Sequence, residues 1–307
     1  METSAPQQRQ SARVARPLVS ALIVSYNVRA SLLETLQALY SSDYGPIEAV
    51  VVDNASRDKS AEAVEAQQPK VSMIRLEQNL GFGRANNAGL AACKGEFILL
   101  LNPDVVVSQD CVRILAEFLS DNPAAGAVGP TLKRPDGRPD LAARRSFPSP
   151  TSALYRFLGL NRLFPKSPRF NRYNLGHVSI ESVHEIDSGT AACLMVRRAA
   201  IDQVGFFDPD YFMYGEDLDL SYRLRAHGWK IYFVPDAVAV HLKGTSTRQA
   251  SGRMRYEFHR AMWLFHRKHY ASRTPSIGNA LIWTGIWARW AALSVRAWIT
   301  RDSRISP

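Results

Sequence analysis

The residues best suited to chemistry follow a short apolar strand, Phe97 to Leu101. This strand runs directly into Asn102-Pro103-Asp104, which presents one amide and one carboxylate. In open α/β sheets, ligands bind at the carboxyl ends of the strands. Hard divalent cations prefer oxygen ligands and commonly complete their shell with substrate phosphates. The stretch therefore predicts a cation and phosphate site, and a plain Asn-Pro turn after a strand is the alternative.

Two further polar residues end apolar strands in the same way. Asp53 follows Val50 to Val52, where its carboxylate could accept a hydrogen bond from a ribose hydroxyl or a pyrimidine N–H. A strand-end Asp-Asn turn would explain it equally well. His241 closes the strand Val238 to Val240, and a neutral imidazole can complete the shell of a metal such as Mn²⁺. A polar surface histidine is the alternative there.

Three carboxylates lie close together in Gly215-Glu216-Asp217-Leu218-Asp219, at the start of a predicted helix. Acidic residues in a first turn stabilise the helix dipole, which is one explanation. The preceding stretch, Phe206 to Tyr214, is crowded with aromatic residues. Carboxylates beside apolar walls can have raised pKa values and act as bases. The stretch is therefore either a favourable helix start or a proton-accepting site.

A glycine-bearing loop, NLGFGRANN at Asn79 to Asn87, opens another predicted helix. Helix N-termini suit phosphate binding. The loop follows the third strand rather than the first, and the turn after the first strand, Ser25-Tyr26-Asn27, has no glycine. Both features disfavour a nicotinamide-dependent enzyme.

The elements that must position these residues alternate between strand and helix. Helix starts are predicted by a Ser31/Glu34 capping box and by Ser108. This alternation predicts βαβ units and a mostly parallel sheet. Later in the chain, short strands are expected at Lys230 to Val234 and at Ala237 to Val240. The apolar strands expected in the first half are Val19 to Ser25, Ile47 to Val52, Val71 to Leu76 and Phe97 to Leu101.

Composition limits the class of partner. The 307 residues are 46% apolar, which allows a proper core, and the formal charge of +10 favours an anionic partner. Lys133 to Arg172 holds ten basic residues against two acids, so it could bind a phosphorylated acceptor or be a solvated loop. No nucleic-acid recognition module is evident. Three scattered cysteines favour a reduced, cytosolic setting. Residues 1–17 have no apolar segment and are expected to be a disordered leader.

The C-terminal stretch, residues 251–307, is basic and rich in tryptophan. Trp283, Trp287 and Trp290 recur at helical spacing, with Arg289 and Arg296 among them. The arginines argue against a spanning helix and favour an amphipathic helix at a membrane interface. A tail packed on the catalytic domain or on a dimer partner is the alternative.

Together these stretches resemble family 2 inverting glycosyltransferases with the GT-A fold. The resemblance spans roughly Val19 to Ser246, and its NPD and NLGFGRANN motifs are most similar to bacterial rhamnosyltransferases of cell-wall or surface polysaccharide assembly. Six motifs occur in the family's order: Val24 to Asn27, Val51 to Ser56, Asn79 to Gly89, Leu99 to Asp104, Gly215 to Trp229, and the His241 segment.

The resemblance implies an α/β fold and a domain plan. A GT-A domain would cover residues 18–250, with a Rossmann-like, mostly parallel nucleotide-binding sheet and helices on both faces. Residues 133–186 would form the acceptor region, and the helical tail would follow.

The resemblance also implies residue roles. Asp217 would be the general base, and Glu216 would contact the acceptor. Asp104, Asn102 and His241 would bind Mg²⁺ or Mn²⁺, although Asn102 replaces the first aspartate of the family's Asp-x-Asp motif. The nucleotide-sugar site would consist of Ser25, Tyr26, Asp53, Asn79, Gly83, Arg84, Asn102 and Asp104.

The expected activity is metal-dependent, inverting sugar transfer, with dTDP-rhamnose as the leading donor and a polyprenyl-diphosphate-linked glycan as acceptor. Alternatives are a UDP-hexose or UDP-galactofuranose donor, or a non-catalytic relative. A nucleotidyltransferase is disfavoured because a lysine-bearing glycine loop after the first strand is absent. The enzyme is expected on the cytoplasmic face of the plasma membrane, without nucleic acid, as a monomer or homodimer.

Overall fold

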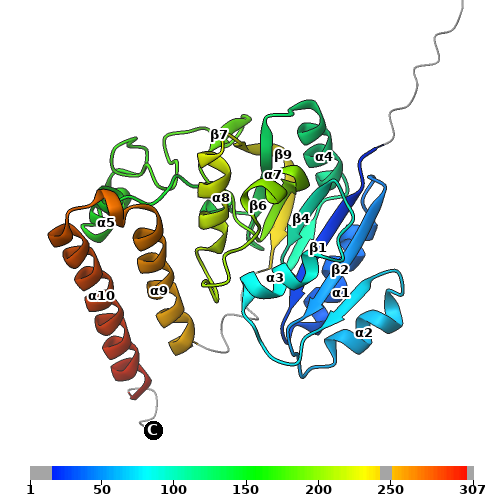
Figure 1. Ribbon diagram of the computed structural model, residues 1–307, viewed down its shortest axis with the longest axis horizontal. Coiled ribbons are helices and arrows are strands. Elements are labelled where there is room, and N and C mark those ends of the chain that lie inside the picture. The colour runs from blue at the N-terminus through cyan, green and yellow to red at the C-terminus, as the bar shows by residue number, and fades with distance from the viewer. Residues whose placement is uncertain (1–15, 243–250, 303–307) are drawn as a thin grey trace, which may run out of the picture.

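The computed structural model describes residues 16–242 and 251–302. A central sheet carries helices on both faces, and a pair of long helices lies at one end of the molecule's long axis (Figure 1). The strand order is β3-β2-β1-β4-β8-β6-β9-β5, and β7 pairs with β9. The strands are β1 (Val19–Ser25), β2 (Ile47–Asp53), β3 (Ser72–Arg75), β4 (Phe97–Leu101), β5 (Val105–Val107), β6 (Ala125–Lys133), β7 (His184–Ile186), β8 (Cys193–Arg197) and β9 (Lys230–His241).

The first half of the sheet is the parallel, Rossmann-like half that the sequence predicts. Strands β3, β2, β1 and β4 are all parallel. The second half is mixed, because β8 runs antiparallel to both β4 and β6, whereas β6 and β9 are parallel. Parallel strands align their carboxyl ends, so the residues after β1, β2 and β4 share one edge of the sheet.

Side chains alternate between two cores, as strand geometry requires. Ile23 of β1 faces one core, and Leu22 and Val24 face the other. The first core includes residues of α1 (Arg29–Tyr40), α2 (Ser60–Gln67) and α4 (Cys111–Asp121). The second includes residues of α3 (Phe82–Leu90), α7 (Arg198–Val204) and α8 (Glu216–Ala226).

The predicted helix starts at Ser31 and Ser108 are wrong. Helix α1 begins at Arg29, so Ser31 lies inside it, and neither α1 nor α4 has a side-chain N-cap. The Arg29 amide instead donates to Asp58 Oδ2 at 2.8 Å, a partner 29 residues away. Ser108 Oγ donates to Asp110 Oδ1, at the residue before α4. A distant residue therefore satisfies the first turn of α1, whereas a local contact between side chains precedes α4.

The two short strands predicted near Pro235 form one strand, β9. Its pairing with β6 shifts register between Pro130 and Thr131, whose partners are Val234 and Val238. This irregularity accommodates Pro235, Asp236 and Ala237 without ending the strand.

The N-terminal leader and the basic insertion are described in part. Residues 1–15 lie outside the described residues, but Arg16 and Pro17 both contact Tyr44, so these two belong to the packed domain. The insertion contains the short 3₁₀ helix η1 (Leu141–Ala143), α5 (Pro150–Phe157) and α6 (Leu160–Leu163). The three cysteines Cys93, Cys111 and Cys193 are buried and unbridged.

Helix α9 (Ser251–His269) is fixed to α8 through a fully buried carboxylate. Asp219 Oδ1 accepts from Lys268 Nζ at 2.7 Å and lies 2.8 Å from His269 Nε2, while Oδ2 accepts from Arg223 Nε at 2.8 Å. Burial alone would raise the pKa of Asp219, but hydrogen bonds from His269, Lys268 and Arg223 lower that pKa to about 2. The tail is therefore anchored to the helix that carries Glu216 and Asp217.

Helix α10 (Ser276–Asp302) follows the short 3₁₀ helix η3 (Ala271–Arg273) and packs back against α9. Trp287 and Trp290 both contact the Tyr256 ring of α9, so most of the tryptophan stripe expected to face a membrane faces α9. The large apolar side chains that α10 exposes include Ile277, Leu281, Trp283, Val295, Trp298 and Ile299. Within the described part of the chain, no helix is both long enough and apolar enough to cross a membrane.

Candidate active site

Ser25 and Asp53 lie side by side at the carboxyl edge of the sheet. They are partners in the register of β1 and β2, and both side chains are buried. Asp53 Oδ2 accepts from the Ser56 amide at 3.1 Å, whereas Asp53 Oδ1 and Ser25 Oγ are buried with no hydrogen-bond partner among the described residues. Buried polar atoms normally have partners. These two oxygens are therefore well placed to accept hydrogen bonds from a ligand, and Tyr26 next to them is partly exposed.

Asn54, which the sequence reasoning missed, holds the glycine loop in place. Its Oδ1 accepts from the Leu80 amide at 2.9 Å, and its Nδ2 donates to Asn79 Oδ1 at 3.1 Å. Asn79 Oδ1 also accepts from the Gly81 amide at 2.9 Å. Asn79 thus shapes the loop from within. The signal for Asn54 was present in the sequence, because it follows Asp53 directly at the strand end.

The loop is pressed against the segment that leads into α8. Gly81 has a φ of +84°, and a Cβ there would lie 2.3 Å from the Phe212 carbonyl oxygen. The Phe82 amide donates to that same oxygen at 2.8 Å. Gly83 is buried, and a Cβ on it would lie 3.3 Å from the Tyr211 oxygen. This contact brings the loop expected to bind the donor next to the N-terminus of α8.

A polar hollow of about 380 Å³ lies between this loop and α9. Arg84 is on its wall, where Nε donates to the Pro209 oxygen at 2.8 Å. Arg260 of α9 donates to the backbone oxygen of Asp210 at 2.8 Å. Neither Arg260 nor Glu257 was predicted as a site residue. The volume of this hollow is in the range of small-molecule binding sites. The lining residues are Gln78, Asn79, Leu80, Arg84, Pro209, Asp210, Phe212, Glu257 and Arg260.

Asp104 and His241 meet because β5 and β9 pair in register. Val105 is opposite His241, so Asp104 Oδ1 lies 3.2 Å from His241 Nε2. Asn102 is joined to the same turn, where its carbonyl accepts from the Val105 amide. Two neighbouring ligands on an octahedral ion with bonds of about 2.1 Å lie roughly 3 Å apart. The Asp104–His241 separation is that of a direct contact between the two side chains, and it is also that of two ligands on one divalent cation.

The described side chains do not form a metal site by themselves. Among residues 16–242 and 251–302, no group of three or more His, Cys, Asp or Glu side chains is arranged to hold an ion. Asp140 is nearby, with its Oδ2 3.8 Å from His241 Nδ1. Phosphate oxygens of a bound substrate and water would have to complete the coordination, as is usual for Mg²⁺.

Glu216 and Asp217 open α8, and the structure gives them different environments. Asp217 Oδ2 is 2.5 Å from Arg145 Nη2, which also donates to the Gly189 oxygen at 2.7 Å. Burial would lower the pKa of Arg145, but Asp217 and Tyr173 raise it, so the guanidinium stays charged. Sequence reasoning missed Arg145, because it lies 72 residues from Asp217 inside a run of arginines.

Glu216 is buried, and its Oε2 has no hydrogen-bond partner among the described residues. Burial, reinforced by the negative charge of Asp217, raises the pKa of Glu216 to about 8. At neutral pH this side chain is largely a neutral acid that can donate a hydrogen bond. The Asp217 carboxyl group, paired with Arg145 and next to Glu216, is an arrangement that can accept one proton and orient the group that loses it.

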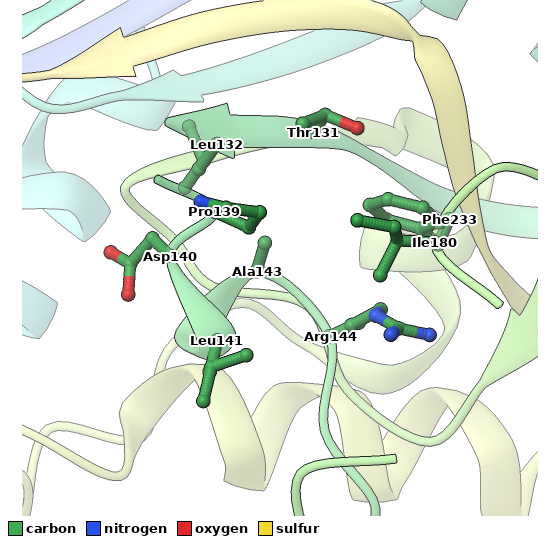
Figure 2. Close-up of a pocket in the computed structure, with 9 residues that line it drawn as sticks. All are labelled: Thr131, Leu132, Pro139, Asp140, Leu141, Ala143, Arg144, Ile180 and Phe233. Carbon is green, nitrogen blue, oxygen red and sulfur yellow. The ribbon is translucent and has the colours of Figure 1, made fainter. Parts of the chain in front are cut away.

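A second, smaller pocket lies beside the insertion (Figure 2). Its lining is mostly apolar, and the Arg144 guanidinium is already engaged, with its centre 5.5 Å from the Phe233 ring centroid and a hydrogen bond to the Val178 oxygen. In the figure, the Asp140 carboxylate points away from the pocket. This pocket lacks the converging free polar groups that a nucleotide would need.

Comparison with known proteins defines the class. The sequence model of Glycosyl transferase family 2 matches residues 20–180, and that of Glycosyl transferase family group 2 matches residues 169–302. The chain therefore belongs to glycosyl transferase family 2, and it is a glycosyltransferase.

Two relatives illustrate the likeness in sequence. An N-acetylglucosaminyl-diphospho-decaprenol L-rhamnosyltransferase of Mycobacterium tuberculosis is 30% identical, over 92% of this chain and 94% of its own. The low-salt glycan biosynthesis hexosyltransferase Agl10 of Haloferax volcanii is 26% identical, over 73% of this chain and 66% of its own.

Solved structures confirm the GT-A-like fold. A mannosyltransferase from Pyrobaculum calidifontis, in complex with GDP-Man and Mn²⁺, has a TM-score of 0.59 at 18% identity, covering 94% of this chain and 80% of its own. S. aureus TarS 1-349, in complex with UDP-GlcNAc, has a TM-score of 0.55 at 19% identity, covering 88% of this chain and 71% of its own.

Proposed function

We propose that this enzyme transfers rhamnose from dTDP-rhamnose to a hydroxyl of a lipid-linked saccharide, with inversion at the anomeric carbon. The observation that carries the proposal is the 30% identity, over nearly the whole of both chains, with a rhamnosyltransferase whose name specifies a polyprenyl-diphosphate-linked N-acetylglucosamine. The site chemistry agrees with a nucleotide-diphosphate donor and a hydroxyl acceptor.

The donor would lie along the carboxyl edge of the sheet. The unpartnered Asp53 Oδ1 and Ser25 Oγ would accept hydrogen bonds from the base or ribose, since both are acceptors buried at strand ends. Arg84 and the loop that begins at Asn79 would line the adjacent wall. Asp104, His241 and Asn102 would hold Mg²⁺ or Mn²⁺, which when bound supplies positive charge to neutralise the departing diphosphate.

Asp217 would act as the general base. It would take the proton from the acceptor hydroxyl as that oxygen bonds to the anomeric carbon and the bond to the diphosphate breaks. Arg145 would hold Oδ2 and fix the carboxylate orientation, and a protonated Glu216 would donate a hydrogen bond to the acceptor. Asp219 is unsuited to the role of base, because its carboxylate is fully buried and is held by three side chains, Lys268, His269 and Arg223. Asp217 keeps a small exposed fraction and is held by one side chain, Arg145, and by the Leu218 amide.

The acceptor's lipid would place the reaction at the cytoplasmic face of a membrane. The exposed apolar residues of α10, with Arg289 and Arg296 on the same helix, support contact with such a surface. A homodimer stays a prediction, as does the absence of a nucleic-acid partner.

A screen of nucleotide sugars tests the proposal. The purified chain would be incubated with Mn²⁺, a polyprenyl-diphosphate N-acetylglucosamine acceptor, and dTDP-rhamnose, UDP-hexoses or UDP-galactofuranose in parallel. We expect rhamnose transfer to exceed transfer from the other donors. Faster turnover of a UDP-sugar would reassign the donor, and no turnover of any donor would leave the non-catalytic alternative.

A further inference from the structure

The basic insertion contains a compact lobe with an unusual charge. We call residues 150–172, which include α5 and α6, the α5–α6 lobe. Between Asp140 and Glu181 the chain has no acidic residue, and five arginines and lysines lie in the lobe itself. These are Arg156, Arg162, Lys166, Arg169 and Arg172. A stretch of this length that carries positive charge and no negative charge favours an anionic partner.

The lobe also exposes large apolar side chains. Leu158 is 58% exposed, Leu163 is 70% exposed and Phe164 is 45% exposed. Arg162 and Lys166 are exposed within three residues of Leu163 and Phe164. Apolar side chains clustered beside exposed basic residues are typical of surfaces that rest in the headgroup region of a bilayer.

Internal contacts hold this arrangement. The Tyr155 and Phe170 rings meet edge to face at 5.0 Å, and the Phe164 and Phe170 rings lie 5.3 Å apart. Arg169 lies over the Phe170 ring, and its Nε is 3.3 Å from the Tyr155 hydroxyl. The lobe thus has a small aromatic core of its own, which leaves Leu158 and Leu163 outside it.

The segment that leads into the lobe is tied to α8. Arg145, just before the lobe, pairs with Asp217, and the Phe147 ring lies 5.1 Å from the Tyr222 ring of α8. Phe147 also lies 6.4 Å from Phe265 of α9. Along the long axis of the molecule, α5 lies at the same end as the α9–α10 pair (Figure 1). The lobe therefore begins five residues after the arginine that pairs with the proposed base.

We propose that the α5–α6 lobe is a second membrane-docking site, which binds an anionic bilayer with Leu158 and Leu163 inserted among the headgroups. Arg162, Lys166 and Arg172 would neutralise lipid phosphates around them. The bilayer is favoured over a nucleic acid because a phosphodiester backbone offers nothing to exposed leucines. The inference deepens the proposed function, on which its biological purpose rests: it names the surface that brings a lipid-linked acceptor to Asp217.

Vesicle binding by the full-length chain tests the lobe. Phosphatidylcholine vesicles, with and without phosphatidylglycerol, would be floated with wild type and with Leu158→Ser/Leu163→Ser. Because α10 is unchanged, we expect partial loss, with vesicle affinity about 10-fold weaker. Arg162→Gln/Lys166→Gln/Arg172→Gln should weaken binding by at least about 10-fold on anionic vesicles and leave binding to neutral vesicles unchanged.

A charge-matched control lies on the nucleotide-binding half. Lys59, Lys70 and Lys94 are exposed there, and changing all three to Gln should leave vesicle binding near that of wild type. Donor binding, followed by calorimetry, should be the same in every variant, which shows that each is folded.

The outcomes separate this inference from the proposed function. Wild-type vesicle binding by both lobe variants would overturn the inference, and so would binding of wild type to an RNA or DNA oligonucleotide but not to vesicles. Failure to transfer any sugar would remove the proposed function while leaving the vesicle result intact. Vesicle binding lost in the lobe variants and kept in the lysine control would support the lobe as a docking site.

Discussion

The protonation of Glu216 should be visible as a pH-dependent stability difference. The pKa of this carboxyl is raised from its ordinary 4.5 to about 8 by burial and by the charge of Asp217. The folded state therefore binds this proton more tightly than the unfolded state. Stability from this group is greatest below pH 4.5 and is lost as the pH rises towards 8.

The size of the effect follows from linkage. Each pH unit between the two pKa values costs about 1.4 kcal/mol of unfolding free energy, so the loss is at most about 5 kcal/mol by pH 8. Glu216→Gln keeps the shape of the side chain but has no proton to lose. Relative to wild type, the variant should gain several kcal/mol of stability between pH 5 and pH 8.5.

Urea unfolding of wild type and Glu216→Gln, at steps across this pH range, measures the difference. Glu65→Gln is a matched control, because that side chain is half exposed and paired with Arg75 on the surface. Its difference from wild type should stay within about 0.5 kcal/mol at every pH. A Glu216→Gln difference as flat as the control would refute the buried, neutral Glu216.

Three other changes test other parts of the site. Asp104→Ala should weaken Mn²⁺ binding at least about 10-fold by calorimetry, because it removes the only charged ligand predicted in the Asn102-Pro103-Asp104 turn. An unchanged Mn²⁺ affinity would mean that this turn does not bind the metal. Gly81→Ala should destabilise the chain by about 1 kcal/mol or more and weaken donor binding, since the added Cβ meets the Phe212 oxygen; a wild-type melting temperature would contradict this. Leu281→Ser/Val295→Ser on the exposed face of α10 should reduce vesicle binding, whereas equal binding would favour a tail that covers another protein surface.

The sequence predicted the elements best where the signal is local. Apolar runs ending in Asp53 and in Asn102-Pro103-Asp104 located two strand ends correctly, because a buried parallel strand requires continuous apolar residues. The aromatic and acidic stretch at Gly215 likewise located the start of α8, which was expected around Asp217 to Asp219 and lies at Glu216.

What the sequence could not predict depends on contacts between distant segments. The Arg145–Asp217 pair joins residues 72 positions apart, and nothing in the arginine-rich insertion distinguishes Arg145 from its neighbours. The orientation of Trp287 depends on where α9 places Tyr256, which helical spacing does not specify. The start of α1 was misplaced because its first-turn amide is satisfied by Asp58 rather than by a local cap.

The central claim is sugar transfer with Asp217 as the base, and a comparison of wild type with Asp217→Asn tests it most directly. Turnover of dTDP-rhamnose with the lipid-linked acceptor would be measured beside calorimetric donor binding. We expect kcat to fall by about 100-fold or more, as is usual when a general base is removed, while the donor Kd stays within about 2-fold of wild type. A kcat near that of wild type, with donor binding intact, would contradict the assignment.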